Sequence, residues 1–207
     1  MARFRPGPYR YSLCSTLSTV VIRTLHRTTL AALSIVLLAF VSAAPAAAQE
    51  RGNEEPRTSP NAAVSQTIGT TEVRLTYGRP QVNDRTIFGG LVSYDEVWRT
   101  GANEATTFSV SSDVTIEGEP LSAGTYSLYT IPGPDTWTII FNNVANQWGT
   151  NYDQSEDALR VEVDADTAPH QHEMMTFVFE EVTDTTGTCV LYWSDVRVPF
   201  DIQVAGS

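Results

Sequence analysis

The chain has 207 residues and a formal charge of −11, and all 13 of its Lys and Arg residues are arginine. Residues 1–48 hold five of these arginines and none of the 24 acids, so residues 49–207 carry eight arginines against 24 carboxylates, a formal charge of −16. Such a negative surface repels phosphate backbones and anionic lipids, which excludes nucleic acid and anionic membranes as expected partners. One cysteine, Cys189, remains after residue 48, so stability must come from the core and not from an intramolecular disulfide.

The first 48 residues have the composition of an export signal. Arginines without acids precede an apolar run over residues 30–41, and Ala46-Ala47-Ala48 supplies the small residues that a signal peptidase requires. The apolar run is shorter than the roughly 20 residues that a membrane-spanning helix needs. We therefore expect a signal peptide over 1–48, cut before Gln49. The expected product is periplasmic or secreted, with no stable membrane insertion after signal removal.

The remainder of the chain indicates an all-β domain. Residues 49–60 are polar and lack periodicity, which is typical of a flexible lead-in. Over residues 61–205, short runs rich in β-branched and aromatic residues alternate with turn residues, and no amphipathic helix of normal length occurs. We expect a hairpin over 63–77 and strands near 106–110, 113–117, 125–131, 136–141, 159–163, 173–182, 187–193 and 196–204. This number of strands predicts a single two-sheet β-sandwich with Greek-key or jelly-roll connections.

Two long segments interrupt the strand pattern, at residues 80–103 and 142–157. Both contain glycine, asparagine and aromatic residues and exceed ordinary hairpin loops. Long ordered loops on a rigid scaffold commonly hold binding groups, so we expect a site where these two loops meet.

Seven side chains in or beside these loops are candidate ligand-binding residues: Arg79, Arg85, Trp98, Arg99, Asn103, Glu104 and Trp148. The three arginines stand out in so acidic a chain. A planar guanidinium binds a carboxylate, phosphate or sulfate through two hydrogen bonds, but it also forms structural ion pairs. Acids suited to such pairs lie in the same region, at Asp84, Asp95 and Glu104.

The two tryptophans have a binding and a structural interpretation, and Asn103 and Glu104 have a possible role in binding. Trp98 and Trp148 could stack on a sugar ring or a cation, or they could fill the ends of the sandwich. Asn103 and Glu104 offer hydrogen-bond donors and acceptors that would orient a ligand.

Signatures of familiar catalytic chemistry are absent from the sequence. It contains no Gly-x-Ser-x-Gly elbow, no phosphate-binding glycine loop and no dinucleotide fingerprint. A glycosidase needs two carboxylates at a defined separation, and Glu104 would have to find its second acid among Asp95, Glu96 and Asp153. The sequence favours a binding protein over an enzyme and indicates no cofactor.

A histidine motif suggests metal binding only weakly. In His170-Gln171-His172-Glu173 the two imidazoles would share one face of an extended segment, but no other histidine or cysteine except Cys189 follows residue 48. Pro169 and the acids before it indicate a loop running into a strand. We therefore expect no metal site here.

Several motifs together resemble the bacterial exported family catalogued as domain of unknown function 2911. They are Tyr77-Gly78-Arg79-Pro80, Ile87-Phe88-Gly89, Trp98-Arg99-Thr100-Gly101-Ala102-Asn103-Glu104-Ala105-Thr106, Ala123-Gly124-Thr125-Tyr126-Ser127-Leu128 and Trp148-Gly149. The resemblance runs from about Ser59 to Val204. It implies an exported β domain and supplies no catalytic residue.

Three hypotheses about function follow. The leading one is a module that binds a small anionic or carbohydrate-like ligand, with Arg79 and Arg99 holding the ligand, Trp98 or Trp148 stacking on it, and Asn103 with Glu104 orienting it. The second is a carbohydrate-directed hydrolase or lyase that uses Glu104. The third is a structural or envelope-assembly protein with no small ligand.

The acidic, lysine-free composition leads to a prediction about salt. Charges of one sign repel each other in the folded state and dissolved ions screen that repulsion, so we expect adaptation to high salt. The thermal unfolding midpoint should rise from low to molar salt in calorimetry. A midpoint that stays level or falls would contradict this expectation.

Overall fold

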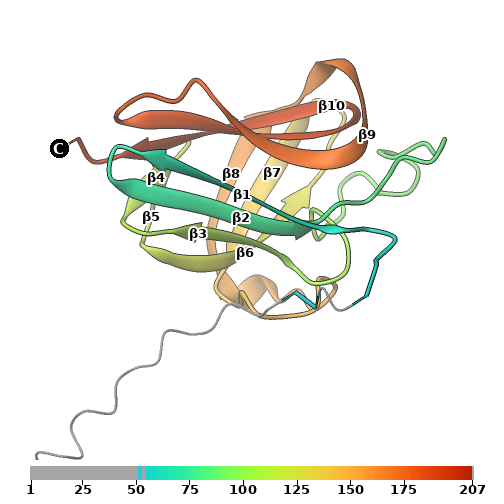
Figure 1. The fold of residues 1–207 in the computed structure, drawn as a ribbon, viewed down its shortest axis with the longest axis horizontal. Coiled ribbons are helices and arrows are strands. Elements are labelled where there is room, and N and C mark those ends of the chain that lie inside the picture. The colour runs from blue at the N-terminus through green and yellow to red at the C-terminus, as the bar shows by residue number, and fades with distance from the viewer. Residues whose placement is uncertain (1–50, 53–54, 207) are drawn as a thin grey trace, which may run out of the picture. The chain divides into compact units, whose positions relative to one another are not determined.

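The computed structural model describes residues 51–52 and 55–206; the predicted signal peptide lies outside them. This part folds into strands joined by loops, with one short 3-10 helix, η1 (Gln154–Glu156) (Figure 1). The strands are β1 (Asn61–Ile68), β2 (Thr71–Gly78), β3 (Thr106–Val110), β4 (Val114–Ile116), β5 (Glu119–Leu121), β6 (Gly124–Ile131), β7 (Thr136–Asn142), β8 (Asp157–Asp164), β9 (Asp166–Glu180) and β10 (Thr186–Val204). Within the described ranges, no helix has the length and hydropathy to cross a bilayer.

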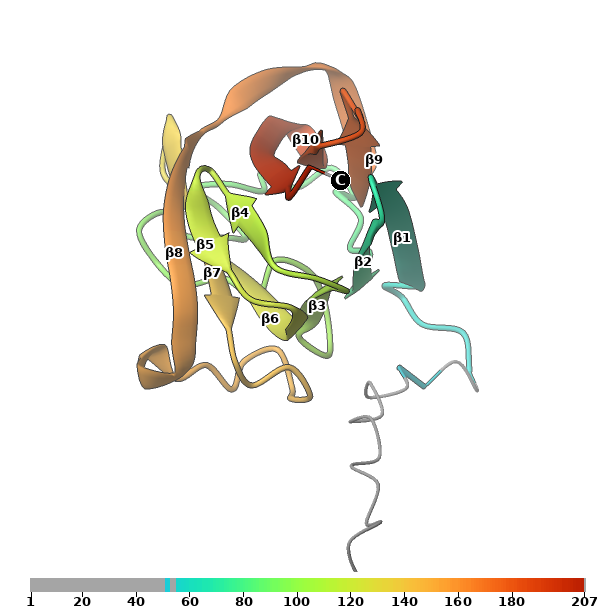
Figure 2. The ribbon, with the colours of Figure 1, turned by 90° about the vertical axis from the view of Figure 1, so that its left-hand side faces the viewer.

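The strands form two antiparallel sheets, which confirms the predicted two-sheet all-β fold. Six strands pair in the order β1-β2-β3-β6-β7-β8 and four in the order β5-β4-β10-β9. The β4–β5 hairpin leaves the first sheet and joins the second, after which β6 returns beside β3. A second change of sheet occurs after β8, where the chain passes over to β9 (Figure 2).

The hydrophobic alternation of the sequence sets most strand positions. The predicted 63–77 hairpin is β1 and β2, and the strand predicted at 106–110 has the observed bounds of β3. Two expectations are wrong. The strands expected at 187–193 and 196–204 are one strand, β10, which bends at Ser194, where φ is +57° and the pairing with β9 shifts register. The loop expected before residue 173 is part of β9, which tolerates Pro169 because it is an edge strand.

Aromatic side chains from both sheets fill the space between them. Phe108 of β3, Phe141 of β7 and Phe200 of β10 are all buried, with ring centroids 5.0–6.1 Å apart. Edge-on contacts, such as those that Phe141 makes with the other two rings, add stability beyond the area they bury. Cys189 lies in the same core with no exposed surface, and burial raises the pKa of its thiol, as expected for an inert structural cysteine.

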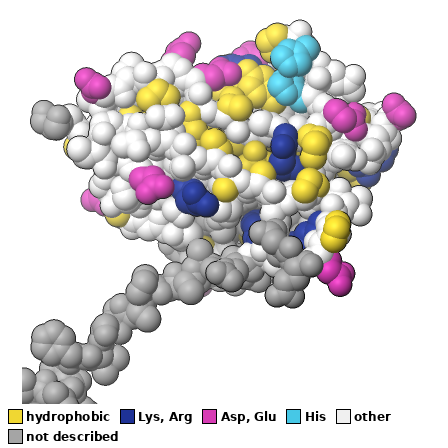
Figure 3. All heavy atoms as spheres, in the orientation of Figure 1, with side chains coloured by type: hydrophobic (Ala, Val, Ile, Leu, Met, Phe, Trp, Pro, Cys, Tyr) yellow, Lys and Arg dark blue, Asp and Glu magenta, His cyan; other side chains and the backbone are white. Residues whose placement is uncertain are grey.

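His170 and His172 lie on the outer face of the β9–β10 pair, where they reach the surface (Figure 3). The His172 ring stacks between His170 and Tyr192, with centroids 4.4 Å from each. Glu173 does not join them, because its Oε1 accepts a hydrogen bond from the backbone N–H of Asn83 at 2.9 Å. Nε2 of His172 is buried without a hydrogen-bond partner among the described residues. The imidazoles thus share a face as predicted, but the adjacent carboxylate has another partner.

This stack predicts a pH dependence of stability. Burial, and secondly the neighbouring His170, lower the pKa of His172. The unfolded chain therefore binds a proton more readily than the folded one, and the free energy of unfolding should fall as pH drops from about 7.5 to about 5. Urea denaturation across this pH range should show that the free energy of unfolding depends less steeply on pH in His172→Gln than in the wild type. His170→Gln should retain most of the slope, because burial is the larger cause; an unchanged slope in His172→Gln would contradict the assignment.

Candidate ligand-binding site

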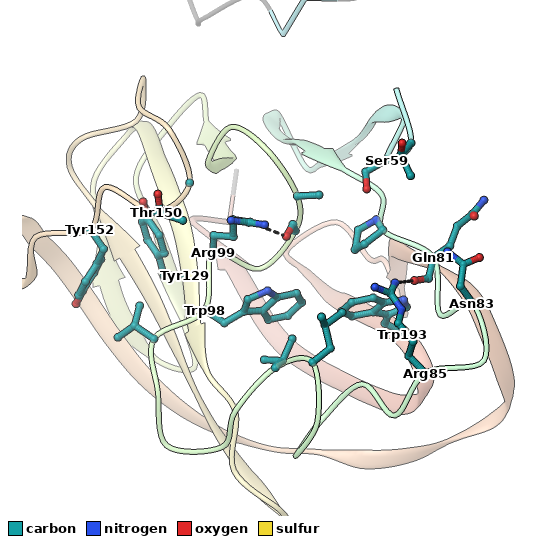
Figure 4. A pocket seen from close by; sticks show the side chains of 18 residues that line it. Ser59, Gln81, Asn83, Arg85, Trp98, Arg99, Tyr129, Thr150, Tyr152 and Trp193 are labelled. Carbon is teal, nitrogen blue, oxygen red and sulfur yellow. Dashed lines mark hydrogen bonds between the residues drawn. The ribbon is translucent and has the colours of Figure 1, made fainter. Parts of the chain in front are cut away.

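A pocket of about 720 Å³ opens where the two long loops meet. Its walls come from five places in the chain: the segment before β1, the 80–102 loop, β6, residues 149–152 and β10 (Figure 4). The volume falls within the roughly 300–1,000 Å³ of typical small-ligand sites. The predicted convergence of the two loops therefore does produce a cavity.

The first loop is held against β6 by backbone pairing. The N–H of Trp98 donates to the carbonyl of Thr130 at 2.7 Å, and the N–H of Thr130 donates back at 2.9 Å. These bonds continue the β3–β6 ladder beyond Thr106, where β3 begins. Trp98 and its neighbour Arg99 are thus fixed by the sheet and do not depend on loop conformation alone.

Backbone strain follows immediately after these two residues. Thr100 has φ of +50°, a conformation that is unusual for a β-branched residue and typically costs about 1–3 kcal/mol. Several contacts hold it: its Oγ1 donates to Thr130 Oγ1 at 3.0 Å, and its carbonyl accepts from Thr106 Oγ1 at 2.7 Å. Such strain is a feature of many functional sites, and here it turns the chain directly beside the pocket.

Four aromatic side chains, Phe88, Trp98, Trp137 and Trp193, form a cluster that we call the aromatic plug. Phe88 contacts all three indoles edge-on, with centroid distances of 4.8–5.9 Å. The Trp98 and Trp193 rings are nearly parallel, 14° apart, with centroids 5.6 Å apart. The plug closes this end of the sandwich, and the Trp98–Trp193 pair also lines the pocket. Trp98 thus packs against the core, as one of the two alternatives predicted, and it also borders the pocket.

The second loop joins the first through backbone hydrogen bonds. The N–H of Gly149 donates to the carbonyl of Asn103 at 3.1 Å, and the N–H of Ala105 donates to the carbonyl of Gln147 at 3.1 Å. A Cβ at position 149 would lie only 2.6 Å from Cδ of Arg99 and 2.7 Å from the Asn103 carbonyl. Glycine is therefore required where the Arg99 side chain passes the second loop.

The three loop arginines have different environments. Arg79 does not line the pocket, because its guanidinium donates to the Met175 carbonyl and to Thr176 Oγ1 of β9. Arg85 and Arg99 do line it. Within the part of the chain that the structure describes, none of the three lies within 4.0 Å of a carboxylate, so the ion pairs considered from the sequence do not form there.

Glu104 is buried and paired with arginines from outside the loop. Arg57 Nη1 donates to its two carboxylate oxygens at 2.7 and 3.0 Å, and Arg51 Nη1 lies 3.8 Å away. The hydrogen bond from Arg57 lowers the pKa of Glu104, so its charge stabilises the fold at neutral pH, and this contribution is lost as pH falls below about 4.5. Burial lowers the pKa of Arg51 to about 10, which leaves it charged at neutral pH. The Arg51 guanidinium also donates to the carbonyls of Thr76 and Ala105.

The predicted site residues therefore separate into two groups. Arg85, Trp98 and Arg99 line the pocket, whereas Arg79, Asn103, Glu104 and Trp148 do not. Trp148 is 49% exposed, and its backbone pairs with that of Glu104. Lining residues that the sequence did not indicate include Ser59, Gln81, Asn83, Tyr129, Thr150, Tyr152 and Trp193. No group of three or more histidine, cysteine or acidic side chains among residues 51–52 and 55–206 is placed to hold a metal ion.

The Glu104 cluster predicts a large effect of one substitution. In Glu104→Gln, the buried Arg51 and the half-buried Arg57 lose their counter-charge, which should lower the free energy of unfolding by about 2 kcal/mol or more. Urea denaturation at neutral pH measures this change. The control is Glu96→Gln, an exposed carboxylate with no hydrogen bond or ion pair among residues 51–52 and 55–206, which should shift stability by less than about 0.5 kcal/mol. Equal effects of the two variants would contradict a structural role for Glu104.

Comparisons with known proteins identify the family of the chain. No curated protein and no solved structure matches it. A family model described as "Protein of unknown function (DUF2911)" matches residues 59–202, a span that includes the pocket-lining residues from Ser59 to Trp193. Because this match covers well over half of the 207 residues, the chain belongs to the DUF2911 family.

Proposed function

We propose that the domain binds a small organic anion in the pocket beside the aromatic plug. The observation that supports this proposal is the sign of the charges around the cavity. Two arginines line it, and none of the described lining residues is Asp or Glu. In a chain with 24 acids and eight arginines after residue 48, a cavity bordered only by positive charge favours a negatively charged occupant.

Both guanidinium groups retain unused donors. A guanidinium carries five N–H groups. Arg85 uses Nε to donate to the Val82 carbonyl at 2.9 Å and Nη2 to donate to the Gln81 carbonyl at 2.5 Å. Arg99 uses Nε to donate to the Gly101 carbonyl at 3.2 Å. The backbone contacts orient both groups, and the remaining N–H groups are available to a carboxylate or phosphate.

The same geometry argues against the hydrolase hypothesis. The Glu104 carboxylate does not line the pocket and is already bonded to Arg57. A glycosidase of the usual kind places two carboxylates around its substrate, and no described lining residue offers one. The third hypothesis, a structural protein without a small ligand, predicts that no anion binds, and the following experiment separates it from a binding module.

A substitution of the two pocket arginines tests the proposal. Titration with malonate, followed through the Trp98 indole N–H signal in NMR spectra, should give saturable binding to the wild-type domain. Arg85→Gln/Arg99→Gln should weaken this binding at least about ten-fold, a loss of about 1.4 kcal/mol, because both cationic partners are removed. An unfolding midpoint close to that of the wild-type domain would show that the variant remains folded.

The matched control is Arg74→Gln. Arg74 is an exposed arginine of β2 that lies outside the pocket and has no carboxylate within 4.0 Å among the described residues. This variant changes the net charge but should keep malonate affinity. Equal weakening by the control, or no saturable binding to the wild-type domain, would contradict an anion site at Arg85 and Arg99.

A further inference from the structure

We infer that the anion recognised by this pocket is an acidic sugar, a pyranose ring that carries a carboxylate, either free or at the end of an oligosaccharide. The inference rests on the proposed anion-binding function and goes further by assigning the uncharged part of the ligand. Two features of the pocket besides its arginines carry the inference: a flat indole surface and a set of unpaired polar side chains.

The indole surface suits the face of a sugar ring. Trp98 is half-buried and lines the pocket, and the buried Trp193, whose ring is nearly parallel to it, supports it from the core. The other rings of the aromatic plug prevent the Trp98 indole from reorienting. An aromatic face is electron-rich, so it attracts the weakly positive C–H groups on one side of a pyranose ring. An inorganic anion has no group that could use this surface.

The arginines lie beside this surface. Figure 4 shows the two indoles next to each other, with Arg99 on the Trp98 side and Arg85 on the Trp193 side. Both arginines line the same pocket as the Trp98 indole, so a ring that stacks on Trp98 shares the cavity with two guanidinium groups. A carboxylate attached to the ring can reach a cation while the ring stays stacked.

Neutral polar side chains surround the same space. Ser59, Gln81, Asn83 and Thr150 line the pocket, and their side chains make no hydrogen bond with any other described residue. In contrast, the hydroxyl of Tyr152 already donates to Asp157 and that of Tyr129 accepts from Gln147. The unpaired hydroxyls and amides come from three separate segments. They offer several donors and acceptors to a ligand that carries hydroxyl groups, which benzoate lacks.

Binding of matched small molecules to the wild-type domain tests the inference. Isothermal titration with galacturonate and glucuronate should show at least one of them binding about ten-fold or more tightly than acetate, benzoate and the neutral sugars galactose and glucose. Ten-fold corresponds to about 1.4 kcal/mol, which one stacked ring with one or two hydrogen bonds supplies.

The outcomes separate this inference from the proposed function. Benzoate binding as tightly as the better uronate, or both uronates binding no better than acetate, would overturn the acidic sugar and leave the anion site standing. Neutral sugars binding as tightly as the uronates would overturn the role of the charge. If no anion in the series binds, the proposed function itself fails.

Variants locate the sugar contacts. Trp98→Ala should reduce uronate affinity to that of acetate, whereas Trp148→Ala, which removes an exposed indole outside the pocket, should leave uronate affinity unchanged. Because Trp98 belongs to the aromatic plug, a second variant guards against loss of the fold. Ser59→Ala/Gln81→Ala should weaken uronate binding about ten-fold while acetate binding is retained. Uronate affinity that survives both Trp98→Ala and this double variant would overturn the assignment.

Discussion

The pair of backbone hydrogen bonds between Trp98 and Thr130 is the constraint on which the candidate site depends. They pair the irregular segment at Trp98 with β6, just beyond the point where the β3–β6 ladder ends. The sheet therefore holds this part of the loop rigid. From this anchor the Trp98 indole enters the aromatic plug and Arg99 passes beside Gly149. The same anchor and the hydrogen bonds that Thr100 makes with the hydroxyls of Thr130 and Thr106 hold its strained φ. The proposed binding surface would therefore need little reorganisation to accept a ligand.

The distribution of arginine partners gives the molecule two kinds of cation. Arg51 and Arg57 form ion pairs with Glu104, a single buried carboxylate. These pairs connect the segment before β1 to the residues just before β3. Arg85 and Arg99 are instead oriented by backbone carbonyls, which accept hydrogen bonds without neutralising the charge. The paired charges at Glu104 thus stabilise the fold, whereas the charges of Arg85 and Arg99, unpaired with any described carboxylate, leave a positive potential in the pocket.

The sequence predicted the fold better than the site, and the reason is the range of the interactions involved. Alternating patterns are local, so the bounds of β3 and the β1–β2 hairpin could be predicted. The bulge at Ser194 could not, because it depends on pairing with β9. Arg85, Trp98 and Arg99 were candidates because of their residue types and their position in or beside the first long loop, and these three line the pocket. The partners of Arg79 and Glu104 lie 97 and 47 residues away, so spacing could not show that both side chains are engaged elsewhere.

The five-part wall of the pocket has a thermodynamic consequence. Its residues range from Thr58 to Trp193, almost from one end of the folded domain to the other. No subset of neighbouring strands can assemble it, so an occupant would stabilise only the fully formed state and would suppress partial opening at either terminus. Occupancy by the proposed ligand would therefore be coupled to global cooperativity, and loss of either terminal strand would abolish that binding even though the arginines remained.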